Sequence, residues 1–172
     1  AFSAAPYLRS ADPLADATTW VVSLPGAGEG MPRGRVVIQM TDEEWRLDLN
    51  TASEDILARL LEDPAAATAI VDYRDADDEG IDDTVDPPYA PKNAPIRTVE
   101  ELWDIPALAA HPELMDRLVR ETTVVTNGTL NINTVGRDVL AAIGGNASLA
   151  EQLVASRPGS DGRLGTADDC KA

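Results

Sequence analysis

The sequence predicts an α+β protein in which a small antiparallel sheet carries a helical insertion with a duplicated helix–turn–helix unit. Two observations lead to this prediction. Short runs rich in β-branched residues occur at 20–24 and 35–40 and are typical of strands. Apolar residues three and four positions apart then recur in several later segments, as in amphipathic helices. Strands and helices are thus grouped along the chain rather than alternating regularly, which favours the α+β class.

A segment that occurs twice defines the helical part. The sequence 47–51, Leu-Asp-Leu-Asn-Thr, returns as 130–134, Leu-Asn-Ile-Asn-Thr, at an offset of 83 residues. The offset continues without gaps through the pairs Asp55/Asp138, Leu57/Leu140, Val71/Val154, Arg74/Arg157 and Asp78/Asp161. Each copy reads as a short strand, a capped helix, a second helix that ends in arginine, and an acidic loop. Such a repeated unit is more typical of an assembly surface than of a reaction centre.

The individual elements follow from local signals. Residues 45–49 alternate as a third strand, and Thr51 with Glu54 forms a capping box that opens a helix. Further helices are expected at 65–74, from Thr98, from His111, at 135–143 and at 147–156. A strand over 122–126, the Asn127-Gly128 turn and a strand over 129–132 predict a β-hairpin. We expect Trp45 and Trp103 in the core.

Composition excludes several function classes. The chain has 172 residues, enough for one domain or two small ones, and a net charge of −16, which repels a phosphate backbone. No apolar run reaches the length of a membrane span, and the chain opens at Ala1 without an initiator methionine, as an excised piece of a longer protein would. The usual enzyme motifs are absent, so we expect no catalytic residues. The single histidine, His111, precedes a proline and is expected to cap a helix.

Two acidic segments are candidate calcium sites. Hard oxygen ligands at alternating positions around a glycine suit Ca²⁺, which takes six to eight oxygens from flexible segments. The first candidate set is Asp75, Asp77, Asp78, Glu79, Asp82 and Asp83, and the second is Asp161, Asp168 and Asp169. The first segment begins like an EF-hand loop but lacks the glutamate expected at its end. The alternative is that both segments are solvated loops without a metal.

Several motifs in a fixed order resemble one protein family. They are the Leu-Asn-Thr-Ala before a helix, the Asp-Tyr-Arg-Asp-Ala-Asp-Asp that closes the next helix, the Pro-Tyr-Ala-Pro-Lys-Asn-Ala-Pro at 88–95, the Thr-Val-Glu-Glu-Leu helix start at 98–102 and the second Asn-Ile-Asn-Thr. Together, from about Arg35 to Arg157, they resemble the type II secretion system minor pseudopilin K, also called general secretion pathway protein K. The C-terminal Gly/Asp loop has no counterpart in that resemblance.

The resemblance implies a fold and a function. The fold is a pilin-like body with a large helical domain inserted between its strands, here divided as 1–50, 51–120 and 121–172. The function is a non-enzymatic place at the tip of the periplasmic pseudopilus, which supports protein secretion across the outer membrane. The partners are the minor pseudopilins I and J. Family members are anchored in the inner membrane by an N-terminal apolar helix that this sequence lacks. Calcium is the one expected cofactor.

Two other functions stay open from the sequence. One is a calcium-stabilised secreted interaction module without a role in the secretion machinery. The other is a helix-hairpin-helix DNA-binding domain, because the repeat also resembles that module. The first hairpin, Glu62-Asp63-Pro64, disfavours DNA because its carboxylates repel phosphate and its proline lacks an amide. The second hairpin, Gly144-Gly145-Asn146, lacks nearby cations.

Overall fold

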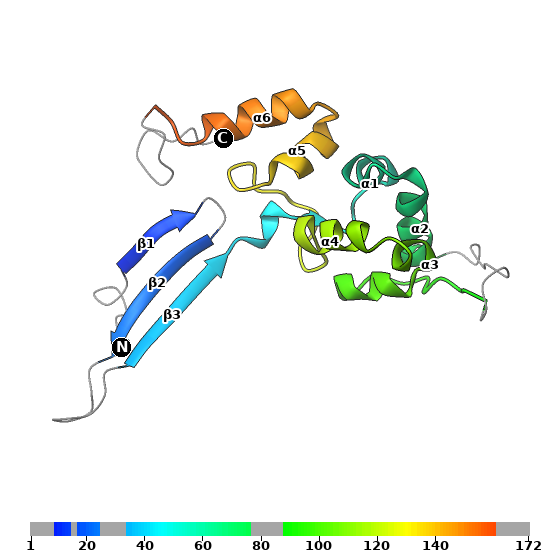
Figure 1. Ribbon diagram of the computed structural model, residues 1–172, viewed down its shortest axis with the longest axis horizontal. Helices are drawn as coiled ribbons and strands as arrows, with labels where there is room; N and C mark the ends of the chain where they lie inside the picture. Colours follow the sequence, from blue (N-terminus) through cyan, green and yellow to red (C-terminus); the bar gives the residue numbers. More distant parts are fainter. Residues whose placement is uncertain (1–8, 15–16, 25–33, 77–87, 161–172) are drawn as a thin grey trace. The chain divides into compact units, whose positions relative to one another are not determined.

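The computed structural model describes residues 9–14, 17–24, 34–76 and 88–160 (Figure 1). The chain divides into two compact units, one formed by 1–42 with 156–172 and one formed by 43–155. This division differs from the three segments expected from the sequence, because both of the expected boundaries, at 50 and 120, fall inside the second unit.

The N-terminal unit contains a three-stranded antiparallel sheet. Its strands are β1 (Arg9–Leu14), β2 (Ala17–Leu24) and β3 (Gly34–Thr41), in the order β1-β2-β3. The register between β2 and β3 is unbroken from Ala17↔Thr41 to Leu24↔Gly34, whereas β1 and β2 lose register between Ala11 and Leu14. The two β-branched runs seen in the sequence lie within β2 and β3, as predicted.

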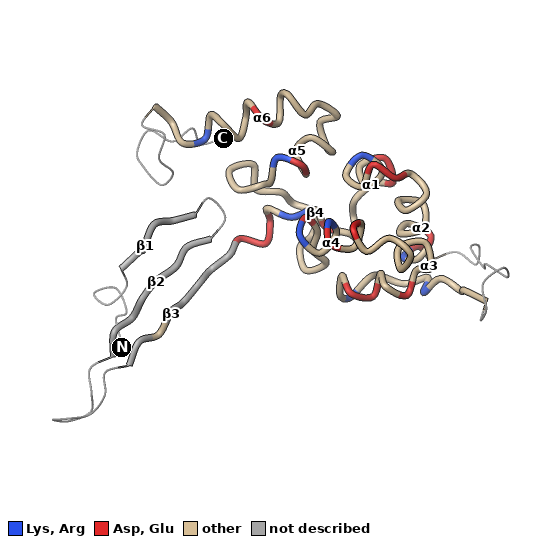
Figure 2. The backbone as a smooth tube through the Cα atoms, viewed as in Figure 1, with Lys and Arg blue, Asp and Glu red and all other residues tan. Residues whose placement is uncertain are grey.

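The second unit, here called the helical unit, is mostly helical (Figure 1). Its elements are η1 (Glu43–Trp45), β4 (Leu47–Asp48), α1 (Glu54–Leu61), α2 (Pro64–Arg74), η2 (Val99–Asp104), α3 (Pro106–Ala109), α4 (Pro112–Glu121), β5 (Thr122–Thr123), α5 (Arg137–Gly144) and α6 (Ala147–Ser156). Charged residues follow the helix dipoles (Figure 2): the first turn of α1 is acidic, and an arginine stands in the last turn of α1, α2 and α4.

The strands that flank α1–α4 pair in parallel. Leu47 aligns with Thr122 and Asp48 with Thr123, and the amide of Leu49 donates to the Thr123 carbonyl at 2.8 Å. Parallel neighbours require a long crossover, which the four helices provide. The α+β class is therefore confirmed, but the prediction that these strands belong to one antiparallel sheet is wrong.

The predicted hairpin at Asn127-Gly128 is also wrong. Strand β5 ends at Thr123, and the Asn127 side chain accepts a hydrogen bond from the Thr129 amide at 3.1 Å, which closes a local turn instead. Gly128 has φ +84°, and a Cβ placed there would lie 2.4 Å from the Thr51 hydroxyl. The turn is therefore packed against the start of the first repeat, where only glycine fits.

The duplication is reproduced residue by residue in the helical unit. Helices α1 and α5 have the same bounds at the 83-residue offset, and α2 and α6 begin at equivalent positions. The turn before each first helix is also the same. The Oδ1 atom of Asp48 accepts from the Asn50 amide at 2.8 Å, and Oδ1 of the equivalent Asn131 accepts from the Asn133 amide at 3.0 Å. This turn uses Thr51, so the N-cap of α1 is Ser53 rather than the predicted Thr51.

One hydrophobic core joins the elements of this unit. Its fully buried large side chains include Leu49, Leu57, Ile70, Ile96, Leu102, Ile105, Leu108, Met115, Leu118, Val135 and Val139. Trp103, expected in the core, is 44% exposed, and Trp45 is half-buried. Within the described ranges, no helix combines the length and the apolar character needed to cross a membrane.

Candidate functional site

The motifs singled out in the sequence meet in one part of the helical unit, which we call the motif junction. It consists of the turn 48–52, the end of α2 at 73–75, the returning segment 88–96, and Glu101 of η2. These pieces are up to 50 residues apart in sequence. Hydrogen bonds between named side chains and distant backbone groups hold them together.

Asn50 connects the first repeat to the returning segment. Its Nδ2 donates to the Ile96 carbonyl at 2.9 Å, and its Oδ1 accepts from the Ile96 amide at 2.8 Å. The side-chain amide thus pairs with both polar groups of one backbone residue, as a neighbouring strand would. Ile96 is almost completely buried, so its backbone groups have little access to water.

Arg74 connects the end of α2 to the turn before α1. Its guanidinium donates to the carbonyls of Leu49 and Ala52, using two of its fixed donors at once. Burial lowers the pKa of Arg74, while the charges of Asp48 and Asp75 act in the opposite direction. We had expected Arg74 to bind a helix C-terminus or an acidic loop, and its actual partners are carbonyls of the repeat turn.

Asp48 organises this turn from inside. The residue is 2% exposed, and its carboxylate accepts from the amides of Asn50 and Thr51 and, through Oδ2, from the Thr126 hydroxyl at 3.0 Å. A buried carboxylate is tolerated when hydrogen bonds compensate its lost hydration. Asp48 therefore fixes both the turn and the segment that follows β5.

The returning segment is held at its other end by α2 and η2. The Asn93 amide donates to the Tyr73 carbonyl at 3.0 Å, and Lys92 donates to the Pro95 carbonyl and to Glu101. The hydrogen bond from Lys92 lowers the pKa of Glu101. Burial raises the pKa of Tyr89 to about 12, with Tyr73 and acidic neighbours adding to the effect.

The predicted metal ligands fall mostly outside the described residues. Asp77, Asp78, Glu79, Asp82, Asp83, Asp161, Asp168 and Asp169 all lie there. Asp75 is described: it caps the C-terminus of α2, and its Oδ1 is buried without a hydrogen-bond partner among the described residues. Asp75 therefore offers one carboxylate oxygen at the start of the acidic segment. In the described part of the chain, no three acidic, histidine or cysteine side chains form a metal-binding group.

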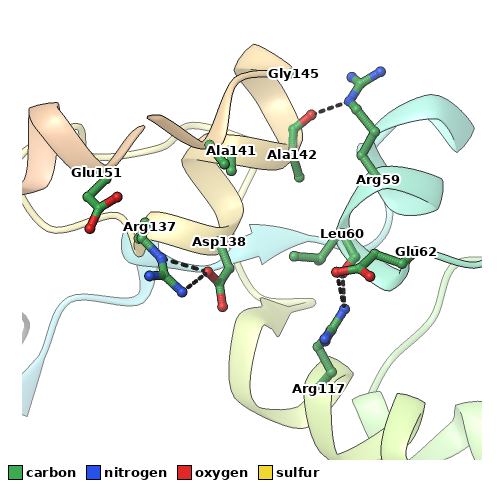
Figure 3. Close-up of a pocket in the computed structure, with 11 residues that line it drawn as sticks. Arg59, Leu60, Glu62, Arg117, Arg137, Asp138, Ala141, Ala142, Gly145 and Glu151 are labelled. Atoms are coloured by element: carbon green, nitrogen blue, oxygen red, sulfur yellow. Dashed lines mark hydrogen bonds and ion pairs between the residues drawn. The ribbon is translucent and has the colours of Figure 1, made fainter. Parts of the chain in front are cut away.

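A pocket of about 560 Å³ lies between the two repeats (Figure 3). It is lined by three arginines and three acidic residues, namely Arg59, Arg117, Arg137, Glu62, Asp138 and Glu151. Arg59 donates to the Ala142 carbonyl in the last turn of α5, and Arg117 donates to the Leu60 carbonyl in the last turn of α1 at 2.9 Å. Carbonyls in a last turn lack partners within their own helix. These two arginines therefore close helix ends across the pocket.

Repeat symmetry explains one of these contacts. Arg59 and Ala142 are equivalent positions of the two copies, and α1 packs against α5. Equivalent residues meet in this way where two copies face each other. Because the pocket's arginines are already engaged and its charges balance, the pocket serves as a joint between the repeats.

The comparisons with known proteins give no match: neither the models of known protein families nor the curated proteins match this chain. The resemblance set out above therefore depends on the motifs and on their order in the sequence.

Proposed function

We propose that this chain is a non-enzymatic structural component of a type II secretion pseudopilus, a minor pseudopilin K acting at the pseudopilus tip with pseudopilins I and J. The observation that carries the proposal is the motif junction. Four of the five segments on which the resemblance depends contact one another there through Asn50, Arg74, Asn93 and Glu101. A chance likeness scattered along the chain would give no reason for these segments to meet.

The chemistry of the junction suits a scaffold. Its polar side chains bind backbone groups of the same chain, so they are used to hold segments together. The fold expected from the family is a pilin-like body with this helical unit inserted. The expected location is the periplasmic face of the inner membrane. Calcium, bound by the acidic segment that starts at Asp75, is proposed to order that segment.

DNA binding is the less favoured alternative. In helix-hairpin-helix modules, amides at the start of the second helix contact a phosphate. Here the Asp63 side chain accepts from the amides of Ala65 and Ala66, and Asn146 accepts from the Leu149 amide. The amides at both helix starts are thus already bound to side chains, one of them anionic.

Size-exclusion chromatography with light scattering tests the proposal. The chain is mixed with the soluble domains of pseudopilins I and J from the same organism, in Ca²⁺ and then in EGTA. We expect a 1:1:1 complex in Ca²⁺ and a weaker one in EGTA. A matched variant, Asp77→Asn with Asp82→Asn, should behave in Ca²⁺ as the unchanged chain behaves in EGTA.

The outcomes separate assembly from metal binding. Absence of a complex in both buffers, with the chain shown to be folded by circular dichroism, would overturn the pseudopilin assignment. A complex that is equally stable in both buffers would support the assignment and contradict the role given to calcium.

A further inference from the structure

The second repeat exposes apolar side chains at positions that the first repeat buries. Ile143 is 39% exposed, Leu149 is 50% and Leu153 is 40%, whereas the equivalent Leu60, Ala66 and Ile70 are 3%, 2% and 0% exposed. Leu149 and Leu153 are four residues apart on α6 and therefore share one helix face. The duplication thus provides an internal comparison between a covered and an exposed form of the same surface.

The first repeat shows what covers this surface. Helix α2 packs closely on α1, and α3 contacts α2 from the other side. Ile105 and Leu108, which are three residues apart, are fully buried in the same core cluster as Ile70. In the described residues of the second repeat, α6 makes few contacts with α5, and no helix takes the place of α3.

We propose that the exposed face of α5 and α6, defined by Ile143, Leu149 and Leu153, binds an amphipathic helix of another protein. By analogy with α3, that helix presents apolar side chains three or four residues apart. Its flanks carry lysine or arginine, because this chain has a net charge of −16 and attracts a basic partner. The mode is a helix laid into an apolar groove. This inference goes beyond the proposed function, and it does not depend on it.

The test uses two designed helical peptides of 18 residues. Both have the same leucine and alanine face, but one has lysine and the other glutamate at the polar positions. Fluorescence anisotropy measures their binding to the whole chain, and amide chemical shifts locate the contact. We expect the lysine peptide to bind with shifts on α5 and α6, and the glutamate peptide to bind at least tenfold more weakly.

Variants separate the apolar contact from simple charge attraction. Leu149→Ser should weaken binding of the lysine peptide about tenfold or more, since the face loses a large apolar contact. Val125→Ser is the matched control, because Val125 is 72% exposed and lies outside this face. Leu149 is half-exposed, so Leu149→Ser should keep its far-ultraviolet circular dichroism spectrum.

Several outcomes would overturn the proposal. Binding of the lysine peptide that is unchanged by Leu149→Ser would reduce it to non-specific attraction. Absence of binding, or nuclear Overhauser contacts between Ile143 and Leu149 in the free chain, would show that no partner helix is needed. Concentration-dependent dimers that Leu149→Ser abolishes would assign the face to a second copy of this chain.

Discussion

At the scale of single residues, Asn50 carries an unusual share of the structure. Its side chain satisfies both backbone groups of the buried Ile96, 46 residues away. A buried backbone group without a partner costs roughly 1–3 kcal/mol. We therefore expect Asn50→Ala to lower the free energy of unfolding by about 2–4 kcal/mol, measured by urea denaturation.

An exposed asparagine provides the control for that prediction. Asn127 makes a local turn bond to the Thr129 amide, so Asn127→Ala should cost less than about 1 kcal/mol. If both variants lose the same small amount, water replaces the Asn50 side chain at Ile96, and the motif junction is not held together in the way described.

Tyr89 predicts a response to high pH. Burial raises the pKa of its hydroxyl from 10.0 to about 12, so the neutral form is favoured in the folded state. The resulting stabilisation is complete below pH 10 and is lost as the pH rises toward 12. The hydroxyl is buried without a hydrogen-bond partner among the described residues. Tyr89→Phe should therefore leave stability at pH 8 nearly unchanged and reduce the loss between pH 8 and pH 11.

The measurement is the urea midpoint of both proteins at the two pH values. Tyr73, whose pKa is also raised by burial, should leave part of the alkaline loss in the variant. An alkaline loss of the same size with and without the Tyr89 hydroxyl would contradict the burial argument.

The sequence predicted residue roles best where a partner is local. The Asp48 turn and the helix positions follow from neighbours in the chain. The partners of Arg74 were predicted wrongly, because they are carbonyls 22 and 25 residues away. The exposure of Trp103 was missed for the same reason: its class of side chain favours burial, but the packing of η2 decides.

At the scale of elements, the duplication provides a built-in comparison of helix ends. Helix α1 ends at Glu62 with φ 58°, and α5 ends at the equivalent Gly145 with φ 63°. This left-handed conformation suits glycine and strains other residues. Glu62 also pairs with Arg117 at 3.5 Å, but its side chain is 81% exposed, and such pairs contribute little.

Exchanging the two residue types should therefore have opposite effects. We expect Glu62→Gly to raise the free energy of unfolding by about 0.5–1 kcal/mol, and Gly145→Ala to lower it by about 1 kcal/mol. Nothing lies within 4 Å of a Cβ at Gly145, so its cost should come from the backbone alone. Thermal and urea unfolding measure both changes. A loss of stability in Glu62→Gly would show that the Arg117 pair outweighs the strain.

The elements that the sequence could not predict are those made by distant pairing. The repeat offset fixed the helix bounds to within a residue, because periodicity and caps act locally. Strands β4 and β5 have two residues each, too few for a pattern, and their parallel direction depends on the path of the four intervening helices. The Asn127-Gly128 hairpin failed because its second strand has no partner: the Asn131 amide binds the Glu44 carbonyl instead.

At the scale of the whole molecule, charge dominates. A net charge of −16 on 172 residues destabilises the compact state through self-repulsion, and much of the acidity lies in two short segments. Two kinds of cation effect follow. Any salt screens the repulsion, whereas a calcium site would respond to Ca²⁺ at millimolar concentration in a way that sodium cannot reproduce.

We expect 1 mM Ca²⁺ to raise the thermal midpoint above that in NaCl of equal ionic strength and above that in 1 mM Mg²⁺. With a dissociation constant on the order of 0.1 mM, the gain is about 1.4 kcal/mol, or roughly 3–6 °C for a chain of this size. The double variants Asp77→Asn with Asp82→Asn and Asp161→Asn with Asp168→Asn test the two segments separately. Removing acidic residues also relieves repulsion, so the quantity to compare is the calcium-dependent rise, not the midpoint itself. A rise that persists in both double variants, or that NaCl reproduces, would assign the effect to screening.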